Sequence, residues 1–97
     1  MASLGMIKKI VARHKPILRE KFNVKEIAIF GSYVRKENNK TSDVDILVDF
    51  SKAISFFRFL ELEQYLKKIV GKKVDLVSRG ALKPIIGKYI LKEAVPL

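Results

Sequence analysis

Two short segments of the sequence carry residues that could do phosphate and metal chemistry. The first is Gly31-Ser32-Tyr33-Val34-Arg35, which joins a glycine turn to a hydroxyl and a guanidinium. The second is Ser42-Asp43-Val44-Asp45, in which two carboxylates alternate along an expected strand. A phosphate-binding turn beside a pair of acids has the parts needed to move a nucleotide, and Asp75 is a candidate third acid.

Asp43 and Asp45 are expected to point to the same face, because side chains alternate across a strand. Their Cα atoms would lie about 6.6 Å apart at roughly 3.3 Å per residue, so both carboxylates can tilt onto a shared cation. Asp49 has the same parity but would lie about 13 Å beyond Asp45, which is too far to share that cation. We therefore interpret Asp49 as a solvated strand end.

Asp75 interrupts an otherwise apolar segment at residues 74–77. Taken alone, such an acid is most simply a solvated residue in a strand. Beside Asp43 and Asp45 it becomes a candidate metal ligand. Because the chain has one histidine and no cysteine, the three carboxylates would form an all-oxygen site, which suits magnesium or manganese better than zinc.

The glycine turn has a separate role in this prediction. Gly31 removes a side chain where a strand turns into a helix, so a ligand can approach the backbone closely. The helix start offers free amide donors for a phosphate, and Ser32 adds a hydroxyl. Arg35 lies one turn later on the same side and could hold phosphate oxygens through its guanidinium. A glycine-serine pair alone is usually only a turn, and the Asp-x-Asp pair that follows strengthens the prediction.

The elements that would position these residues alternate between helix and strand, which predicts an α/β fold with a small mixed sheet flanked by helices. We expect strands at residues 27–30, 44–50 and 74–77 and a short edge strand at 94–97. Helices are expected at 56–70, with Ser55 as N-cap and Gly71 as the stop, and at 82–90, where Gly87 weakens the pattern. Pro16 predicts a break in the N-terminal helix, with one helix ending near Arg13 and another opening around Pro16.

Several aromatic side chains have a structural and a functional interpretation. The cluster Phe56-Phe57-Arg58-Phe59 could stack nucleic-acid bases, but its helical spacing favours packing in the core. His14 is interpreted as a packed residue at the helix break. Tyr33, Tyr65 and Tyr89 are interpreted as packing or amphipathic surface residues.

The whole-chain properties set broad limits. The 97 residues are expected to form a single domain, with residues 1–5 a disordered extension if Met6 is the start. No apolar run approaches the roughly 20 residues that span a bilayer, and no secretory signal is visible, so a cytoplasmic location without membrane contact is expected. The net charge of +10 indicates either attraction to polyanions or a solvated lysine-rich surface. The basic residues are dispersed, so nucleic acid is a possible partner but not the favoured one.

The glycine-serine turn, Arg35, the Ser42-Asp43-Val44-Asp45 segment and Asp75 together resemble the nucleotidyltransferase superfamily that includes DNA polymerase beta. The short length resembles its minimal branch, the MNT domain proteins. The resemblance implies a palm-like fold, two magnesium ions on the three acids, and the triphosphate of ATP on Gly31 and Ser32. It also implies that Asp75 is nearest the acceptor oxygen and could take its proton, while Arg35 neutralises triphosphate charge.

The chain departs from the usual pattern of that family at two positions. Val34 stands where alanine is common, and Lys36 stands where glycine is common. Val34 is expected only to repack the short helix. Lys36 could stiffen the turn, or it could add a charge for the triphosphate, and it is therefore included among the candidate nucleotide-binding residues.

The resemblance also implies a partner, because minimal members are typically encoded beside a HEPN-domain toxin and transfer AMP from ATP to a tyrosine on it. The expected function is magnesium-dependent transfer of AMP to a hydroxyl of that toxin, with the chain acting as antitoxin in a hetero-oligomer. The alternatives are an antitoxin that neutralises by binding alone, a nucleotidyltransferase acting on nucleic acid or a small molecule, and a nucleic-acid-binding domain without chemistry. The three acids favour an enzyme, and the shortness of the chain places the acceptor on a partner.

Overall fold

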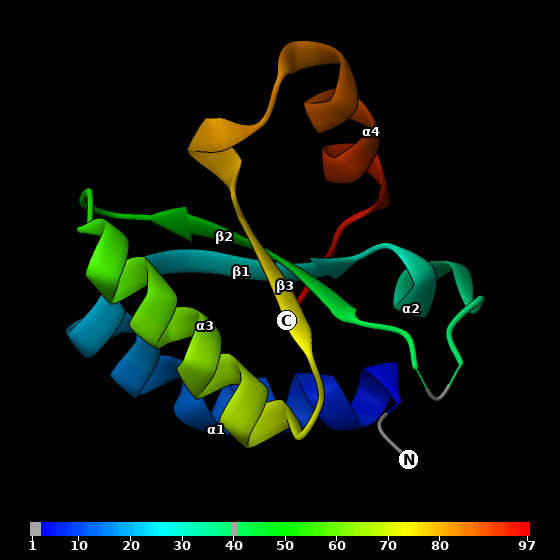
Figure 1. Cartoon of the computed structure of the whole chain (residues 1–97), viewed down its shortest axis with the longest axis horizontal. Helices are drawn as coiled ribbons and strands as arrows, with labels where there is room; N and C mark the ends of the chain where they lie inside the picture. Colours follow the sequence, from blue (N-terminus) through cyan, green and yellow to red (C-terminus); the bar gives the residue numbers. More distant parts are fainter. Residues whose placement is uncertain (1–2, 40) are drawn as a thin grey trace.

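The computed structural model describes residues 3–39 and 41–97, which form a mixed sheet between helices (Figure 1). The elements follow one another in the order α1 (Leu4–Phe22), β1 (Val24–Phe30), α2 (Ser32–Arg35), β2 (Val44–Phe50), α3 (Phe56–Val70), β3 (Val74–Ser78), a 3₁₀ turn η1 (Arg79–Ala81), α4 (Pro84–Glu93) and β4 (Val95–Pro96). The expected α/β fold with a small mixed sheet is confirmed.

The order of the strands in the sheet is β3-β2-β1-β4. β1 runs antiparallel to both β2 and β4, whereas β2 and β3 are parallel. A parallel pair needs a crossover connection, and α3 supplies it. The register places Asp45 of β2 next to Phe30 on one side and next to Asp75 on the other. Two acids that are 30 positions apart in the chain thus become neighbours in the sheet.

The core lies on one face of the sheet, under α1 and α3, which run side by side (Figure 1). Alternate residues of the central strands point into it, and the corresponding faces of the two helices cover them. The largest fully buried side chains there are Phe22, Ile7, Leu18, Ile29, Ile46, Leu62 and Leu66. Because side chains alternate, Asp45 and Asp49 point to the opposite face, on which α4 lies (Figure 1).

The break expected at Pro16 is wrong, because α1 continues from Leu4 to Phe22 with Pro16 inside it. A proline inside a helix removes one backbone hydrogen bond and crowds the preceding turn, at a cost of about 3 kcal/mol. Val11 before the proline and Leu18 after it are both buried on the same side of the helix. Packing on both sides of Pro16, which is itself exposed, therefore offsets the local preference for a break.

The ends of the helices follow local signals. Ser55 accepts a hydrogen bond from the backbone of Arg58 at 3.1 Å, and Gly71 ends α3 with φ 75°, as expected. Ser3 caps α1, so the helix includes Leu4 and Gly5 of the segment expected to be an extension. The first two residues of that segment lie outside the described residues. β1 begins at Val24, three residues earlier than predicted.

α4 is held to the rest of the molecule by little apolar packing, since Gly87 is its one buried residue. A Cβ atom at position 87 would lie 3.0 Å from Cβ of Leu82. The glycine that weakened the predicted helix thus allows close packing against the segment that leads into it. Outside this contact, α4 exposes a row of apolar side chains: Ile85, Ile86, Tyr89 and Leu91.

The aromatic cluster on α3 does not pack as predicted. Phe56 and Phe57 are 71% and 78% exposed, and they contact each other edge to face with ring centroids 6.4 Å apart. Phe59 is the member that packs against the core, next to Phe50. Because both side chains are mostly exposed, the core-packing prediction is wrong for Phe56 and Phe57.

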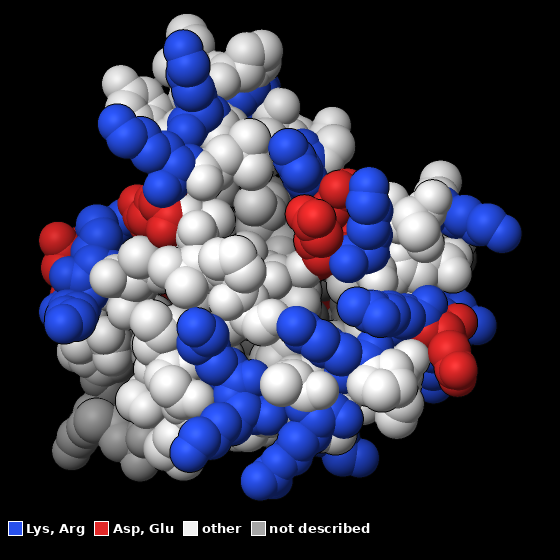
Figure 2. All heavy atoms as spheres, turned by 180° about the vertical axis from the view of Figure 1, so that it is seen from behind, with Lys and Arg blue, Asp and Glu red and all other residues white. Residues whose placement is uncertain are grey.

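The surface charge is spread over several elements (Figure 2). Lysine and arginine side chains are dense where α1 crosses the face seen in Figure 2, and acidic side chains lie among the basic ones elsewhere. The described residues include no helix that combines the length and the hydrophobicity required for a membrane span.

Candidate active site

The acids of the candidate site lie at one end of the outer sheet face. Asp45 and Asp75 are directly paired in the register of β2 and β3. Asp43 lies just before β2 and is exposed, whereas Asp45 is half-buried and Asp75 is exposed. The structure thus brings Asp45 and Asp75 together, with Asp43 two residues away from Asp45.

The electrostatics of this cluster centre on Asp45. Burial raises the pKa of the Asp45 carboxyl above its ordinary value, and the negative charges of Asp75 and then Asp43 raise it further. The positive charge of Arg35 lowers that pKa, but the raising influences prevail. A carboxyl in this environment is destabilised when ionised, and an added cation would relieve the repulsion.

Gly31 lies against the same carboxylate. It follows β1, has φ 79° and ψ −149°, and is buried. A Cβ atom at this position would lie 2.1 Å from Oδ2 of Asp45, closer than any real contact. The glycine is therefore required both for its backbone conformation and for the close approach of the turn to the acid.

Arg35 and Glu93 are joined by hydrogen bonds beside the Gly31 turn. Both carboxylate oxygens of Glu93 accept hydrogen bonds from Nη1 of Arg35 at 2.9 Å. One of these oxygens, Oε1, also accepts a hydrogen bond from the backbone N–H of Gly31. A second acid, Glu37, accepts from Nε of Arg35 at 3.0 Å. The arginine that was predicted to hold phosphate thus contacts two carboxylates of its own chain.

Ser32 and Lys36 occupy the two ends of α2. Ser32 is its half-buried first residue, and its carbonyl accepts the backbone N–H of Lys36, which ends the helix. Lys36 has φ 60°, a left-handed conformation that favours glycine. This backbone conformation fits the glycine that the resemblance predicts at position 36, and the Lys36 side chain is exposed.

Asp49 differs from its prediction as a purely solvated strand end. Its Oδ2 atom lies 3.8 Å from Nη1 of Arg79 in η1, and its side chain is 31% exposed. Asp49 is separate from the pair of Asp45 and Asp75, as predicted, because Asp49 lies four residues beyond Asp45 along β2. The positive partner was not visible in the sequence, since the turn that brings Arg79 over the sheet follows β3.

The predicted metal ligands are spread apart in the structure. Within residues 3–39 and 41–97, no group of three histidine, cysteine, aspartate or glutamate side chains lies close enough together to hold a metal ion. The donors nevertheless have suitable chemistry, because Asp43, Asp45 and Asp75 offer hard oxygen atoms, and burial together with the charges of Asp75 and Asp43 raises the pKa of Asp45.

Glu93 is the site residue that sequence reasoning missed. It contacts Gly31 across 62 positions of sequence, so no local motif includes it. One signal was present: an acid in the last turn of a helix is electrostatically unfavourable, because the helix C-terminus carries partial negative charge. An acid in that position indicates a partner elsewhere, and here the partners are Arg35 and Gly31.

His14 was predicted to be a packed residue at a helix break; it lies inside the continuous α1 and contacts Tyr65. Nδ1 of His14 lies 2.6 Å from the hydroxyl of Tyr65, so this pair joins α1 to α3 on the core side of the sheet. Ser42 accepts the backbone N–H of Asn39 at 2.9 Å, which shapes the loop before Asp43. None of these contacts reaches the acid cluster.

Comparison with known proteins identifies relatives along nearly the whole chain. The model of the nucleotidyltransferase domain family matches residues 11–96. The protein adenylyltransferase MntA of Thermococcus cleftensis is 50% identical over 95 residues, which cover 98% of this chain and 96% of that protein.

Solved structures give the same picture of the fold. A structure assigned as a minimal nucleotidyltransferase has a TM-score of 0.76 at 30% identity, covering 94% of this chain and 95% of that one. A chain in the complex of a tri-AMPylated HEPN toxin of Shewanella oneidensis with MNT antitoxin has a TM-score of 0.68 at 22% identity, covering 94% and 71%. At that identity the second likeness concerns the fold alone. The acids beside the glycine turn, the family match and the relatives agree, and the chain belongs to the nucleotidyltransferase domain family.

Proposed function

We propose that this chain transfers AMP from ATP to a hydroxyl group of a HEPN-domain toxin and so acts as its antitoxin. The observation that carries the proposal is the placement of Asp45 between Asp75 and the Gly31 turn. This arrangement places the Gly31 turn, which can bind phosphate, next to acids that can accept the proton of an acceptor hydroxyl. The adenylyltransferase relative supports AMP as the transferred group.

The nucleotide end of the site would consist of the turn and the short helix after it. The N–H of Gly31 and the hydroxyl of Ser32 would bind phosphate oxygens, and Arg35 would neutralise charge as the bond to pyrophosphate breaks. Lys36 is exposed beside them and could add a further positive charge. Glu37 and Glu93 contact Nε and Nη1 of Arg35, so a phosphate bound through either of those atoms would replace a carboxylate.

Asp43, Asp45 and Asp75 would hold magnesium, with manganese as a substitute. When bound, such ions supply positive charge that brings the triphosphate and the acceptor oxygen together. The chain's own contribution is the position of the acids: Asp45 lies against the turn that would bind phosphate, and Asp75 lies on its far side. Asp75 would therefore be the carboxylate that accepts the proton of the acceptor hydroxyl.

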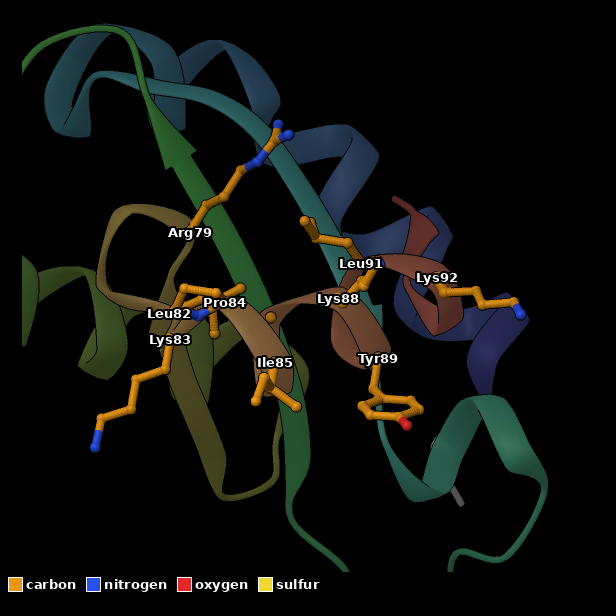
Figure 3. Close-up of a pocket in the computed structure, with 10 residues that line it drawn as sticks. Arg79, Leu82, Lys83, Pro84, Ile85, Lys88, Tyr89, Leu91 and Lys92 are labelled. Carbon is orange, nitrogen blue, oxygen red and sulfur yellow. The ribbon is translucent and has the colours of Figure 1, made fainter.

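The acceptor would be presented by a docked protein, and α4 offers a surface for it. α4 lies over the sheet face that bears the acids (Figure 1). Together with η1 it lines an open cavity of about 800 Å³, and Figure 3 shows Ile85 and Tyr89 projecting from the helix. Ile85 is 76% exposed, and Lys83 and Lys88 line the same cavity. An apolar surface with positive charge at its edge fits a protein with an apolar contact patch and acidic residues around it.

The same surface also supports a second candidate function, in which the chain neutralises its partner by binding alone. The two functions differ in their dependence on the acids, because docking on α4 does not require Asp45 or Asp75. Transfer of AMP requires both.

The deciding experiment mixes the chain, ATP and magnesium with the protein encoded beside it, and detects added AMP by mass spectrometry. We expect AMP on a hydroxyl-bearing residue, with tyrosine the expected acceptor, and we expect the modification to disappear with Asp45→Asn. Asp49→Asn is the matched control, because it removes an acid of the same strand face outside the cluster. Tight co-purification without any modification would favour neutralisation by binding alone.

A further inference from the structure

Glu93 occupies the hydrogen-bond donors that the proposed function assigns to the nucleotide. Its carboxylate accepts the N–H of Gly31 and also binds Arg35 through both oxygens at 2.9 Å. A carboxylate that joins a backbone N–H to a guanidinium reproduces the way these groups bind an oxygen pair of a phosphate. The Glu93 side chain is only 25% exposed, so most of its surface is in contact with the protein.

The position of Glu93 creates a conflict with a bound triphosphate. Its carboxylate accepts from both the Gly31 N–H and Nη1 of Arg35, the two donors that a phosphate oxygen would use. A triphosphate placed on Gly31 while Glu93 remained there would meet an additional carboxylate and would find the Gly31 N–H already in use. Like charges at such short range disfavour each other strongly in a partly buried site.

The structure also provides a way for Glu93 to leave. It is the last residue of α4, and Gly87 is the one buried residue of that helix. A change of the Glu93 rotamer therefore disturbs little of the core, while β4 keeps its pairing with β1. Arg35 would keep Glu37, which binds its Nε at 3.0 Å and does not contact Gly31.

We propose that Glu93 is a built-in occupant of the phosphate position, which ATP must displace in order to bind. The proposal rests on the proposed function, since it assumes that Gly31 and Arg35 bind the triphosphate. Glu93 thereby lowers the affinity of the resting protein for ATP. The end of α4 becomes the element that controls access of the nucleotide to the acids.

The test measures ATP binding by titration calorimetry with magnesium and without any acceptor protein. Glu93→Gln keeps the size of the side chain and removes its charge, and we expect its Kd for ATP to fall about tenfold, the scale of one charge-assisted hydrogen bond. Glu37→Gln is the matched control, because it removes the other carboxylate partner of Arg35 but leaves the Gly31 N–H occupied. Its Kd should change by no more than about threefold, as expected for an exposed ion pair.

Glu93→Ala is the second variant, because glutamine can still accept from Gly31. Circular dichroism establishes that each variant is folded, and both Glu93 variants must bind ATP more tightly than the wild type. If they bind ATP equally or more weakly, Glu93 positions Arg35 and the proposal is overturned. If neither the wild type nor any variant binds ATP, the nucleotide-binding part of the proposed function falls as well.

Discussion

The outer face of β2 carries one acid near each end, and the two acids have opposite surroundings. Asp45 is half-buried between Asp75 and the Gly31 turn, and its pKa is raised. Asp49 lies on the same face four residues away and is paired with Arg79. The same residue type on the same strand is neutralised by the chain itself at one end. At the other end negative charge accumulates, which suits a cation that arrives with a substrate.

The largest expected difference between the two ends is catalytic. Asp45→Asn should lower AMP transfer about a thousandfold, equivalent to ~4 kcal/mol of transition-state stabilisation. Asp49→Asn should leave the rate within about twofold. Both rates are measured under saturating ATP with the partner protein. Equal losses in the two variants would show that the acids do not differ in function.

The second difference concerns how closely the backbone approaches each acid. Gly31→Ala should destabilise the fold by about 3 kcal/mol, because φ 79° is unfavourable for alanine and the methyl group would collide with Asp45. Gly80→Ala, at the Asp49 end, is the control, since its Cβ would meet only Oγ of Ser78 at 4.0 Å. Its effect should stay within about 0.5 kcal/mol. Urea denaturation measures both, and a stable Gly31→Ala variant would contradict the close approach.

The third difference is the direction in which each substitution changes the stability of the fold. The pKa of Asp45 is raised by folding, so the native state loses stability as the pH rises through that pKa. Asp45→Asn should remove this loss and increase the thermal midpoint at pH 7 in metal-free buffer, with wild type and variant converging in acid. Asp49→Asn removes the contact with Arg79 and should lower stability by no more than about 1 kcal/mol. A lower midpoint for Asp45→Asn at pH 7 would refute the electrostatic description of the cluster.

The smallest expected effect lies in the turn after Arg35. Lys36→Gly should stabilise the chain by about 0.5–1 kcal/mol, because Lys36 has a left-handed backbone. Asn23 has a similar φ of 54°, but asparagine tolerates this conformation, so Asn23→Gly should gain less. The KM for ATP, measured in parallel, decides the role of the side chain. An unchanged KM would exclude Lys36 from triphosphate binding.

Local sequence patterns predicted the elements that position the acids. The bounds of β2 and α3 were predicted correctly, because strand alternation, the Ser55 cap and the Gly71 stop are encoded within a few residues of each end. The proximity of Asp45 and Asp75 could be predicted only by considering the Asp-x-Asp segment and the segment at residues 74–77 together. The register that pairs them depends on the crossover through α3, which no single segment encodes.

Features that depend on long-range contacts were not predictable in the same way. Pro16 favours a break locally, but burial of Val11 and Leu18 on either side keeps α1 continuous. The pairing of Arg35 with Glu93 joins two segments that are 58 positions apart in the sequence, and no motif contains both residues. Free carboxylates and arginines are common on any surface, so their pairing emerges only from the fold.

The sparse packing of α4 has a consequence for the way the molecule opens. α4 contributes one buried residue. The chain on either side of it is held in the sheet, by β3 before the helix and after it by the hydrogen bond from the N–H of Leu97 to the carbonyl of Ile27. α4 should therefore unfold as a tethered loop while the sheet, α1 and α3 stay intact. Its amide protons should exchange with solvent far sooner than those of β2, making residues 84–93 the first cooperative unit to open.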